Sequence, residues 1–181
     1  MGKLAPHGTR LSVLYSADQI AARVRELAQD IHASMGPDLL VIPVLKGSFI
    51  FAADLLRALH GVGAEPDMDF ISLSSYGGHT ESSGQVRIVR DTEAAIAGRD
   101  VLLVDDILES GRTLAFAQDL MMARRAHSVR TCVLLDKPGK LAVGIKPDFV
   151  GFTCPDRFVV GYGMDVAHAF RQLPFVGFVE G

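Results

Sequence analysis

The sequence is poor in cysteine and has no cysteine or histidine pair at metal-binding spacing. Cys132 and Cys154 are the two cysteines of the chain, and they do not form a CxxC pair. The six histidines also lack the spacing that is typical of metal ligands. We therefore expect two reduced, structural thiols, as in a protein of the cytosol.

Positive net charge and long apolar runs are absent as well. The formal net charge is −3 and the pI is about 6.0, so no global positive field would gather nucleic acid or anionic lipid. No apolar run approaches the ~20 residues of a membrane span, and the stretch MGKLAPHGTRL at the N-terminus has no long apolar segment. The expected setting is the cytoplasm, with small-molecule substrates and with no nucleic acid or membrane as partner.

The sequence does contain enough apolar material for one domain with a full core. The chain has 181 residues, of which 49% are hydrophobic. This size and composition suit an α/β domain. We predict a single domain over residues 1–181.

Helical and strand-like stretches alternate along most of the chain. In residues 16–35, apolar residues recur at helical spacing behind a capping box formed by Ser16 and Gln19. Short continuous apolar runs further on are typical of strands buried on both faces. Strands are predicted at 39–45, 69–75, 101–105 and 131–136, and further helices at 49–60 and 113–126.

This alternation predicts an α/β fold with a mostly parallel central sheet flanked by helices. Ligands bind outside the carboxyl ends of such strands, so the polar turns that follow them are expected on one rim. Past residue 140 the pattern changes to short strand-like pieces, PDFVGF, FVVGYG and FVGFV, which predict a small antiparallel appendage. We expect the core over about residues 16–140 and the appendage over about 1–15 and 141–181.

The stretch VLLVDDILESGRTL, residues 101–114, places two carboxylates at the end of a predicted buried strand. Side chains alternate across a strand, so Asp105 and Asp106 can both reach the rim only where the strand ends. Carboxylates accept hydrogen bonds from a ribose diol and also bind Mg2+. The following Ser110 and Gly111 lie just before a helix, whose free N–H groups favour a phosphate. The stretch therefore suits a sugar phosphate, and a plain turn with a capping serine is the alternative.

Receiver domains of response regulators also carry an acidic pair, at the end of their first strand. In a chain of 181 residues, the part that follows Asp106 is too short for the rest of such a fold. The receiver-domain interpretation is therefore disfavoured.

Five stretches, in family order, resemble the hypoxanthine-guanine phosphoribosyltransferase family, which has the type I phosphoribosyltransferase fold. VLLVDDILESGRTL is similar to the phosphoribosyl-pyrophosphate motif of that family, and VLKGSFIFAADLLR (44–57) to its pyrophosphate loop and the helix after it. SSYGG (74–78) resembles the start of its catalytic lid, and LLDKPG (134–139) its base-contacting lysine segment. PDFVGFTCPDRFVVGYGMD (147–165) resembles its purine-binding hood. The resemblance implies that the appendage is a small antiparallel hood built from the C-terminal segment and the N-terminus.

The resemblance implies a site for phosphoribosyl pyrophosphate. The two aspartates would hold the ribose hydroxyls, the loop over 109–113 would wrap the 5'-phosphate, and a cis peptide would join Leu45 to Lys46. The residues implied for this substrate are Lys46, Gly47, Asp105, Asp106, Ile107, Leu108, Ser110, Gly111, Arg112, Thr113 and Arg171. Ser75 and Tyr76 would belong to a lid, formed by the Gly/Ser-rich loop up to about residue 85, that closes over the pyrophosphate.

The resemblance also implies a purine site. Lys137 would donate to the oxygen at purine position 6, Phe158 would stack on the ring, and the backbone of Val159 would meet the opposite edge. Because a lysine can only donate, this arrangement selects a 6-oxopurine over adenine, whose amino group is also a donor. Asp165 would lie at the purine site and, with Asp105, would bind Mg2+, the implied cofactor.

Glu109 departs from the family, which usually has aspartate at this position. The resemblance implies that its carboxylate is the catalytic general base at purine nitrogen 7. Glutamate keeps the carboxylate but adds a methylene, so a proton-transfer distance of about 2.6–3.2 Å needs another rotamer or a shifted loop.

The implied activity converts hypoxanthine or guanine and phosphoribosyl pyrophosphate into IMP or GMP and pyrophosphate. A preference for xanthine is an alternative. Another is a nucleotide-sensing RNA-binding regulator on the same fold, which would need a denser basic face than the pair Arg124 and Arg125 supplies. We expect a homodimer or homotetramer, with Met121 and Met122 as a candidate apolar contact.

Overall fold

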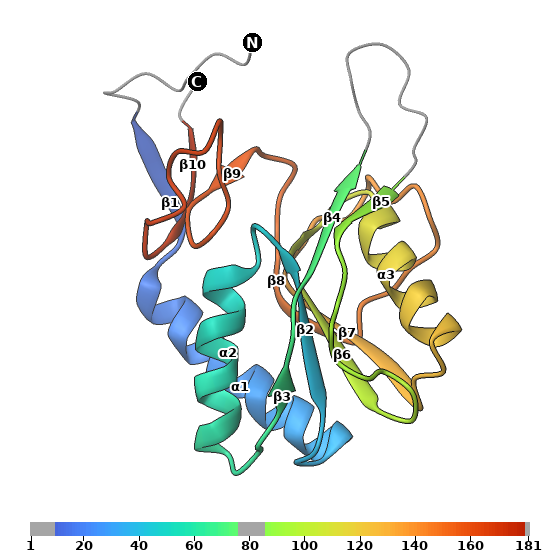
Figure 1. The fold of residues 1–181 in the computed structure, drawn as a ribbon. Coiled ribbons are helices and arrows are strands. Elements are labelled where there is room, and N and C mark those ends of the chain that lie inside the picture. Colours follow the sequence, from blue (N-terminus) through green and yellow to red (C-terminus); the bar gives the residue numbers. More distant parts are fainter. Residues whose placement is uncertain (1–9, 76–85, 180–181) are drawn as a thin grey trace.

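The structure is a computed structural model that describes residues 10–75 and 86–179. These residues form two sheets and three helices (Figure 1). The predicted lid, including Tyr76, falls on residues 76–85 and lies outside the described residues.

The larger sheet has the strand order β5-β4-β2-β6-β7-β8, and β3 pairs with β2. Its strands are β2 (Leu40–Leu45), β3 (Asp67–Met68), β4 (Ile71–Ser75), β5 (Val86–Arg90), β6 (Asp100–Leu108), β7 (Ser128–Asp136) and β8 (Phe149–Thr153). Every neighbouring pair is parallel except β4 and β5. The predicted mostly parallel α/β sheet is therefore confirmed.

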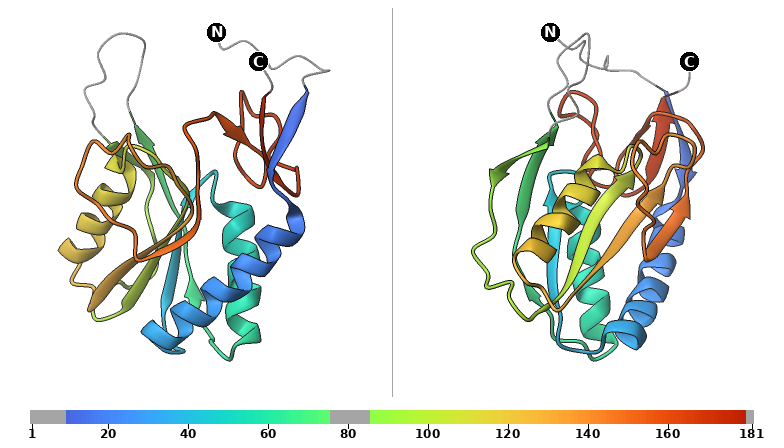
Figure 2. Two further views of the ribbon diagram at one scale, coloured as in Figure 1. Left: turned by 180° about the vertical axis from the view of Figure 1, so that it is seen from behind. Right: turned by 90° about the vertical axis from the view of Figure 1, so that its right-hand side faces the viewer.

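Helices cover both faces of this sheet, as Figure 2 shows from two sides. Helices α1 (Ala17–Met35) and α2 (Phe49–Gly61) lie on one face, and α3 (Arg112–Ala123) lies on the other. The predicted capping box is confirmed at the start of α1, where Ser16 and Gln19 bond reciprocally.

The central strand β6 sends alternate side chains into two separate core clusters. Leu102 and Val104 pack in the cluster that contains α1 and α2 residues. Val101 and Leu103 pack in the cluster that contains α3 residues. This alternation is what a strand buried on both faces requires, and it explains the continuous apolar run in the sequence.

The smaller sheet forms the predicted hood from both ends of the chain. Its order is β1-β10-β9, with β1 (Leu11–Tyr15) and β9 (Val159–Val160) both antiparallel to β10 (Val176–Val179). The prediction that residues 147–152 join this sheet is wrong, because β8 pairs parallel with β7 and extends the core. A short apolar piece does not reveal which sheet it joins.

Two further expectations need correction at α3. The helix ends at Ala123 rather than residue 126, because Arg125 takes a left-handed backbone with φ 63° that a helix cannot continue. Met121 is fully buried in the core, so it cannot form the expected contact surface, whereas Met122 is 52% exposed.

Three polar tethers join the hood and the edge of the larger sheet to the rest of the molecule. The Tyr162 hydroxyl donates to Asp54 of α2 at 2.6 Å, and the Tyr15 hydroxyl donates to the Thr153 carbonyl of β8 at 2.5 Å. Arg23 of α1 donates to backbone carbonyls of β8 at 2.8 and 2.9 Å.

Within the described residues, no helix has the length and apolarity to cross a membrane.

Candidate active site

Among the described residues, three cavities lie along the loops that follow the parallel strands. One lies beside the N-terminus of α3, one beside the turn after β2, and one beneath the hood. Asp106 lines two of them. The predicted rim is therefore a single region in which several loops converge.

Strand β6 continues past the acidic pair, and its two aspartates line different cavities. The pairing of β6 with β7 extends to Leu108, so the strand does not end at Asp105 as predicted. Asp105 lines the cavity beside α3, whereas Asp106 lines the other two. The neighbours serve different cavities because side chains alternate along a strand.

The environment of the pair disfavours two negative charges. Burial raises the pKa of Asp105 well above its ordinary value, and the nearby charge of Asp106 raises it further. Burial also raises the pKa of Asp106. The Asp106 backbone N–H donates to Asp105 Oδ1 at 3.0 Å, and this bond holds the Asp105 carboxylate against the backbone of Asp106. Such a pair gains from any cation or hydroxyl donor that a ligand brings.

The turn after β2 fits closely between the strand β6 and the hood. A cis peptide joins Leu45 to Lys46, as predicted. A methyl group on Gly47 would overlap the Asp106 carboxylate, and one on Gly163 would overlap the Gly47 carbonyl. Glycine at both positions therefore lets three chain segments meet without a side chain between them.

A cavity of about 380 Å³ beside this turn is rich in charged groups. Its lining includes Lys46, Asp106, Asp165 and Arg171, together with Leu45, Gly47, Ser72, Leu73, Ser74 and Val89. Arg171 pairs with Asp165 at 2.7 Å and donates to the Gly163 carbonyl at 2.6 Å. Lys46 and Arg171 thus supply two cations to one cavity, which suits a ligand with several negative charges.

The loop before α3 forms a second, smaller cavity of about 180 Å³. It is lined by Asp105, Ile107, Leu108, Glu109, Ser110, Gly111, Thr113 and Leu114. Gly111 has a left-handed backbone with φ 77°, and a Cβ there would lie 2.6 Å from Ile145. The free backbone N–H groups of the α3 N-terminus border this cavity, which suits a phosphate. Arg112, the first residue of α3, does not line it.

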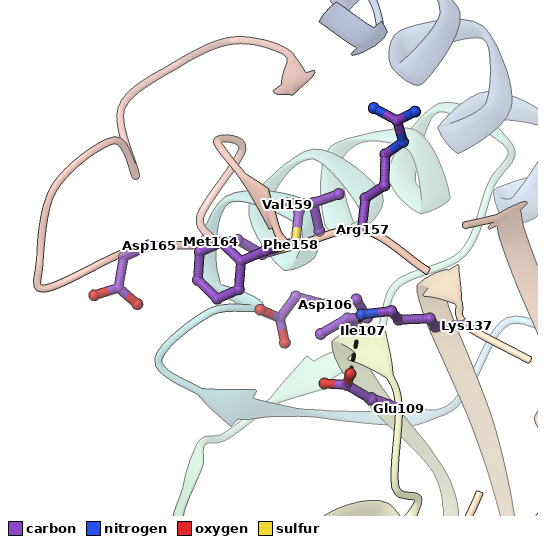
Figure 3. A pocket seen from close by; sticks show the side chains of 9 residues that line it. All are labelled: Asp106, Ile107, Glu109, Lys137, Arg157, Phe158, Val159, Met164 and Asp165. Atoms are coloured by element: carbon purple, nitrogen blue, oxygen red, sulfur yellow. Dashed lines mark hydrogen bonds and ion pairs between the residues drawn. The ribbon is translucent and has the colours of Figure 1, made fainter. Parts of the chain in front are cut away.

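The third cavity, of about 180 Å³, lies under the hood (Figure 3). It is lined by Asp106, Ile107, Glu109, Lys137, Arg157, Phe158, Val159, Met164 and Asp165. The Phe158 side chain is 61% exposed although it is aromatic. An exposed ring beside a buried lysine offers a stacking surface and a hydrogen-bond donor to a flat ligand.

The Lys137 ammonium is held by carboxylates at the wall of this cavity. Its Nζ donates to Glu109 Oε1 at 2.9 Å and lies 3.3 Å from Asp156 Oδ1. Desolvation lowers the pKa of Lys137, but the bonds to Glu109 and Asp156 outweigh it and the pKa is raised. Lys137 is therefore a permanent cation and a hydrogen-bond donor.

The residues at the rim include several that the sequence analysis missed. Met164 and Arg157 line the cavity under the hood, and Lys140 and Asp156 form ion pairs beside it. Figure 3 shows the Arg157 guanidinium pointing away from Lys137, and it lies 4.3 Å from the Phe178 ring centre. These residues lie in or next to the segments that resemble the family, but a lone charge in a loop gives no periodic signal.

The donors at the rim fit a magnesium ion that binds together with a substrate. Mg2+ is usually held by one or two carboxylates and by substrate oxygens. Asp106 and Asp165 line the same cavity, whereas Asp105 lines another. The structure thus brings Asp165 together with Asp106 rather than with Asp105.

Comparisons with known proteins agree with this geometry. The phosphoribosyl transferase domain matches residues 12–167. The chain is 42% identical to the hypoxanthine-guanine phosphoribosyltransferase of Bacillus subtilis, over 93% of this chain and 92% of that protein. It is 43% identical to the bifunctional protein TilS/HprT of Listeria innocua over 99% of its own length, and it spans 27% of that longer protein.

A solved structure of similar sequence has the same fold. The crystal structure of a hypoxanthine-guanine phosphoribosyltransferase from Bacillus anthracis superposes with a TM-score of 0.88 at 42% identity. The superposition covers 95% of this chain and 99% of that chain. This chain therefore belongs to the phosphoribosyltransferase family, within its hypoxanthine-guanine group.

Proposed function

We propose that the protein is a 6-oxopurine phosphoribosyltransferase of purine salvage. It would convert hypoxanthine or guanine and phosphoribosyl pyrophosphate into IMP or GMP and pyrophosphate. The observation that carries the proposal is that the buried Lys137 and the exposed Phe158 ring line one cavity. The neighbouring cavity is the one that Lys46 and Arg171 line. A donor-only group next to a stacking surface favours a purine that carries an oxygen at position 6.

Each cavity would take one part of the substrates. The cavity beside α3 suits the 5'-phosphate, the cavity with Lys46 and Arg171 suits the pyrophosphate, and the cavity with Lys137 suits the base. Asp106 lines both the pyrophosphate cavity and the base cavity, so it is the group best placed to hold the ribose hydroxyls between them.

Charge stabilisation is the main contribution we assign to the protein. As the bond between the anomeric carbon and the pyrophosphate breaks, Lys46 and Arg171 would stabilise the departing negative charge. Positive charge would build on the ribose ring near Asp106, while nitrogen 9 of the purine attacks. Glu109 would accept the proton from nitrogen 7. When bound, Mg2+ would add electrostatic stabilisation of the pyrophosphate, and Asp165 and Asp106 are the residues that would hold it.

The test is a spectrophotometric screen of hypoxanthine, guanine, xanthine and adenine with phosphoribosyl pyrophosphate and Mg2+. We expect turnover of hypoxanthine or guanine and no turnover of adenine. Reactions without phosphoribosyl pyrophosphate serve as blanks. Turnover of xanthine alone would move the assignment to the xanthine-specific alternative, and turnover of adenine alone, or of no base, would refute the proposal.

We also propose that the protein is a homodimer or homotetramer of the cytoplasm. Apolar side chains left uncovered on the surface support self-association, among them Met122 of α3 at 52% exposure and Val89 of β5 at 60%. Light scattering coupled to size exclusion measures the assembly directly, and a monomer at micromolar concentration would contradict this proposal.

A further inference from the structure

Four charged side chains form a closed ring at the wall of the cavity under the hood, which we call the base cavity. Lys137 contacts Glu109 at 2.9 Å and Asp156 at 3.3 Å. Lys140 contacts the same two carboxylates, Asp156 at 2.7 Å and Glu109 at 3.5 Å. Cations and anions therefore alternate around what we call the charge ring, which consists of Glu109, Lys137, Asp156 and Lys140.

The charge ring joins three loops that come from different strands. Glu109 follows β6, the two lysines follow β7, and Asp156 follows β8. The Lys137 side chain is 6% exposed, whereas that of Lys140 is 46% exposed. Lys137 is therefore the member that a ligand in the cavity would meet without competing water, and Lys140 closes the ring from the solvent side.

The hydrogen-bonding capacity of Lys137 limits what the ring leaves available. An ammonium has three N–H donors and no acceptor. Glu109 accepts from one of these donors and Asp156 lies within ion-pair distance at 3.3 Å, which leaves at least one donor for an oxygen of the ligand. Each carboxylate is in turn shared with Lys140, so neither of them depends on Lys137 alone.

We propose that Lys140 is a positioning residue of the base site. It attracts both Glu109 and Asp156 from the solvent side, so that Lys137 keeps a free donor for the purine oxygen and Glu109 keeps its orientation beside the base. This inference rests on the proposed function, because it requires a 6-oxopurine in the cavity.

The charge of the ring supports this role. The ring has two positive and two negative members, and without Lys140 it would carry a net negative charge. Lys137 alone would then face both carboxylates, Glu109 at 2.9 Å and Asp156 at 3.3 Å. The oxygen of a purine would have to compete with these carboxylates for the same ammonium.

The test compares Lys140→Met with two controls. Lys140→Arg keeps the charge, and Lys146→Met removes an exposed lysine six residues away that has no ion pair among the described contacts. Calorimetry measures binding of IMP, which fills the base cavity, and of ribose 5-phosphate, which does not. We expect Lys140→Met to weaken IMP binding about fivefold and to leave ribose 5-phosphate binding unchanged. Lys140→Arg should restore most of the affinity, and Lys146→Met should match the parent.

The outcomes separate this inference from the proposed function. If the parent turns over hypoxanthine or guanine but Lys140→Met binds IMP as the parent does, the positioning role is wrong. Equal weakening of IMP and ribose 5-phosphate binding, or no recovery of IMP affinity in Lys140→Arg, would also overturn it, since either result indicates a structural effect. A parent that turns over no purine refutes the proposed function first and this inference with it.

Discussion

Gly47 lies so close to Asp106 that a methyl group on its α-carbon would overlap the Asp106 carboxylate. On the other side, a methyl group on Gly163 would overlap the Gly47 carbonyl. The turn after β2, the strand β6 and the hood are thus in direct contact at one point. Any side chain introduced there displaces at least one wall of the pyrophosphate cavity.

Gly47→Ala should therefore impair substrate binding far more than folding. The added methyl group pushes the turn away from Asp106, and a misplaced charged group lowers kcat/KM for phosphoribosyl pyrophosphate by about 100-fold. Steady-state kinetics and thermal unfolding measure the two effects. Gly61→Ala is the matched control, because a Cβ at the end of α2 meets nothing within 4 Å, and it should leave both unchanged. Parent-like kinetics for Gly47→Ala would contradict the close contact.

Glu109 tests the assignment of the general base. Glu109→Asp keeps a carboxylate and should retain or improve turnover, whereas Glu109→Gln removes the proton acceptor. We expect the glutamine variant to lower kcat by roughly 100-fold, a common contribution of general acid–base catalysis. Pre-steady-state and steady-state rates on hypoxanthine provide the measurement. If Glu109→Gln equals the parent in kcat/KM, the carboxylate of Glu109 serves only its ion pairs with Lys137 and Lys140.

Asp105 is expected to reduce stability at neutral pH. Its pKa is raised by burial and by the charge of Asp106, so the folded chain holds this proton more tightly than the unfolded chain. Between the ordinary pKa of about 3.9 and the raised value, the folded state binds more protons, and stability falls as the pH rises. Asp105→Asn removes this penalty and should increase Tm by about 2–4 °C while it lowers activity.

The pH dependence separates this effect from a general change in packing. The Tm difference between Asp105→Asn and the parent should be larger at about pH 8 than at about pH 5, where more of the aspartate is protonated. Asp119→Asn, at an exposed position of α3, is the control and should show no such trend. A difference that is constant with pH would mean that ionisation of Asp105 does not oppose folding.

The tether between Tyr162 and Asp54 should matter for binding as well as for stability. Tyr162→Phe removes a partly buried 2.6 Å hydrogen bond, and since Asp54 stays partly solvated, the loss is about 1 kcal/mol. The loop that begins at Tyr162 carries Asp165 and Arg171, so KM for phosphoribosyl pyrophosphate should also rise. Tyr15→Phe, which removes a hood bond to β8, should lower Tm without raising KM. Identical KM changes in both variants would argue against a specific effect of the Tyr162 loop.

The sequence predicted the elements whose signals are local. The capping box of Ser16 and Gln19 and the buried strands depend on neighbours a few residues apart, and both are present in the structure. The sheet that β8 joins, and the burial of Met121 beside an exposed Met122, depend on partners far away in the chain. Such choices are set by packing, which a short apolar stretch does not encode.

The same distinction holds at the candidate site. The acidic pair was found because its two members are adjacent, whereas the partners of Glu109 lie on other loops. Its ion pair with Lys137 joins residues 28 apart in sequence. Asp156 was part of a segment that resembles the hood, yet it carries no motif by itself.

The divergence of Asp105 and Asp106 makes the hydrogen-bond register of β6 a determinant of substrate recognition. Asp105 lies opposite Val133 of β7 and faces the cavity beside α3, and the next residue faces the other two. A slip of one residue would exchange the two carboxylates between cavities and would also turn the apolar residues of β6 to the wrong face. The same shift in strand pairing would therefore both bury the wrong side chains and misplace the carboxylates. Because the core disfavours that shift, packing of the apolar residues of β6 also fixes the positions of the two carboxylates.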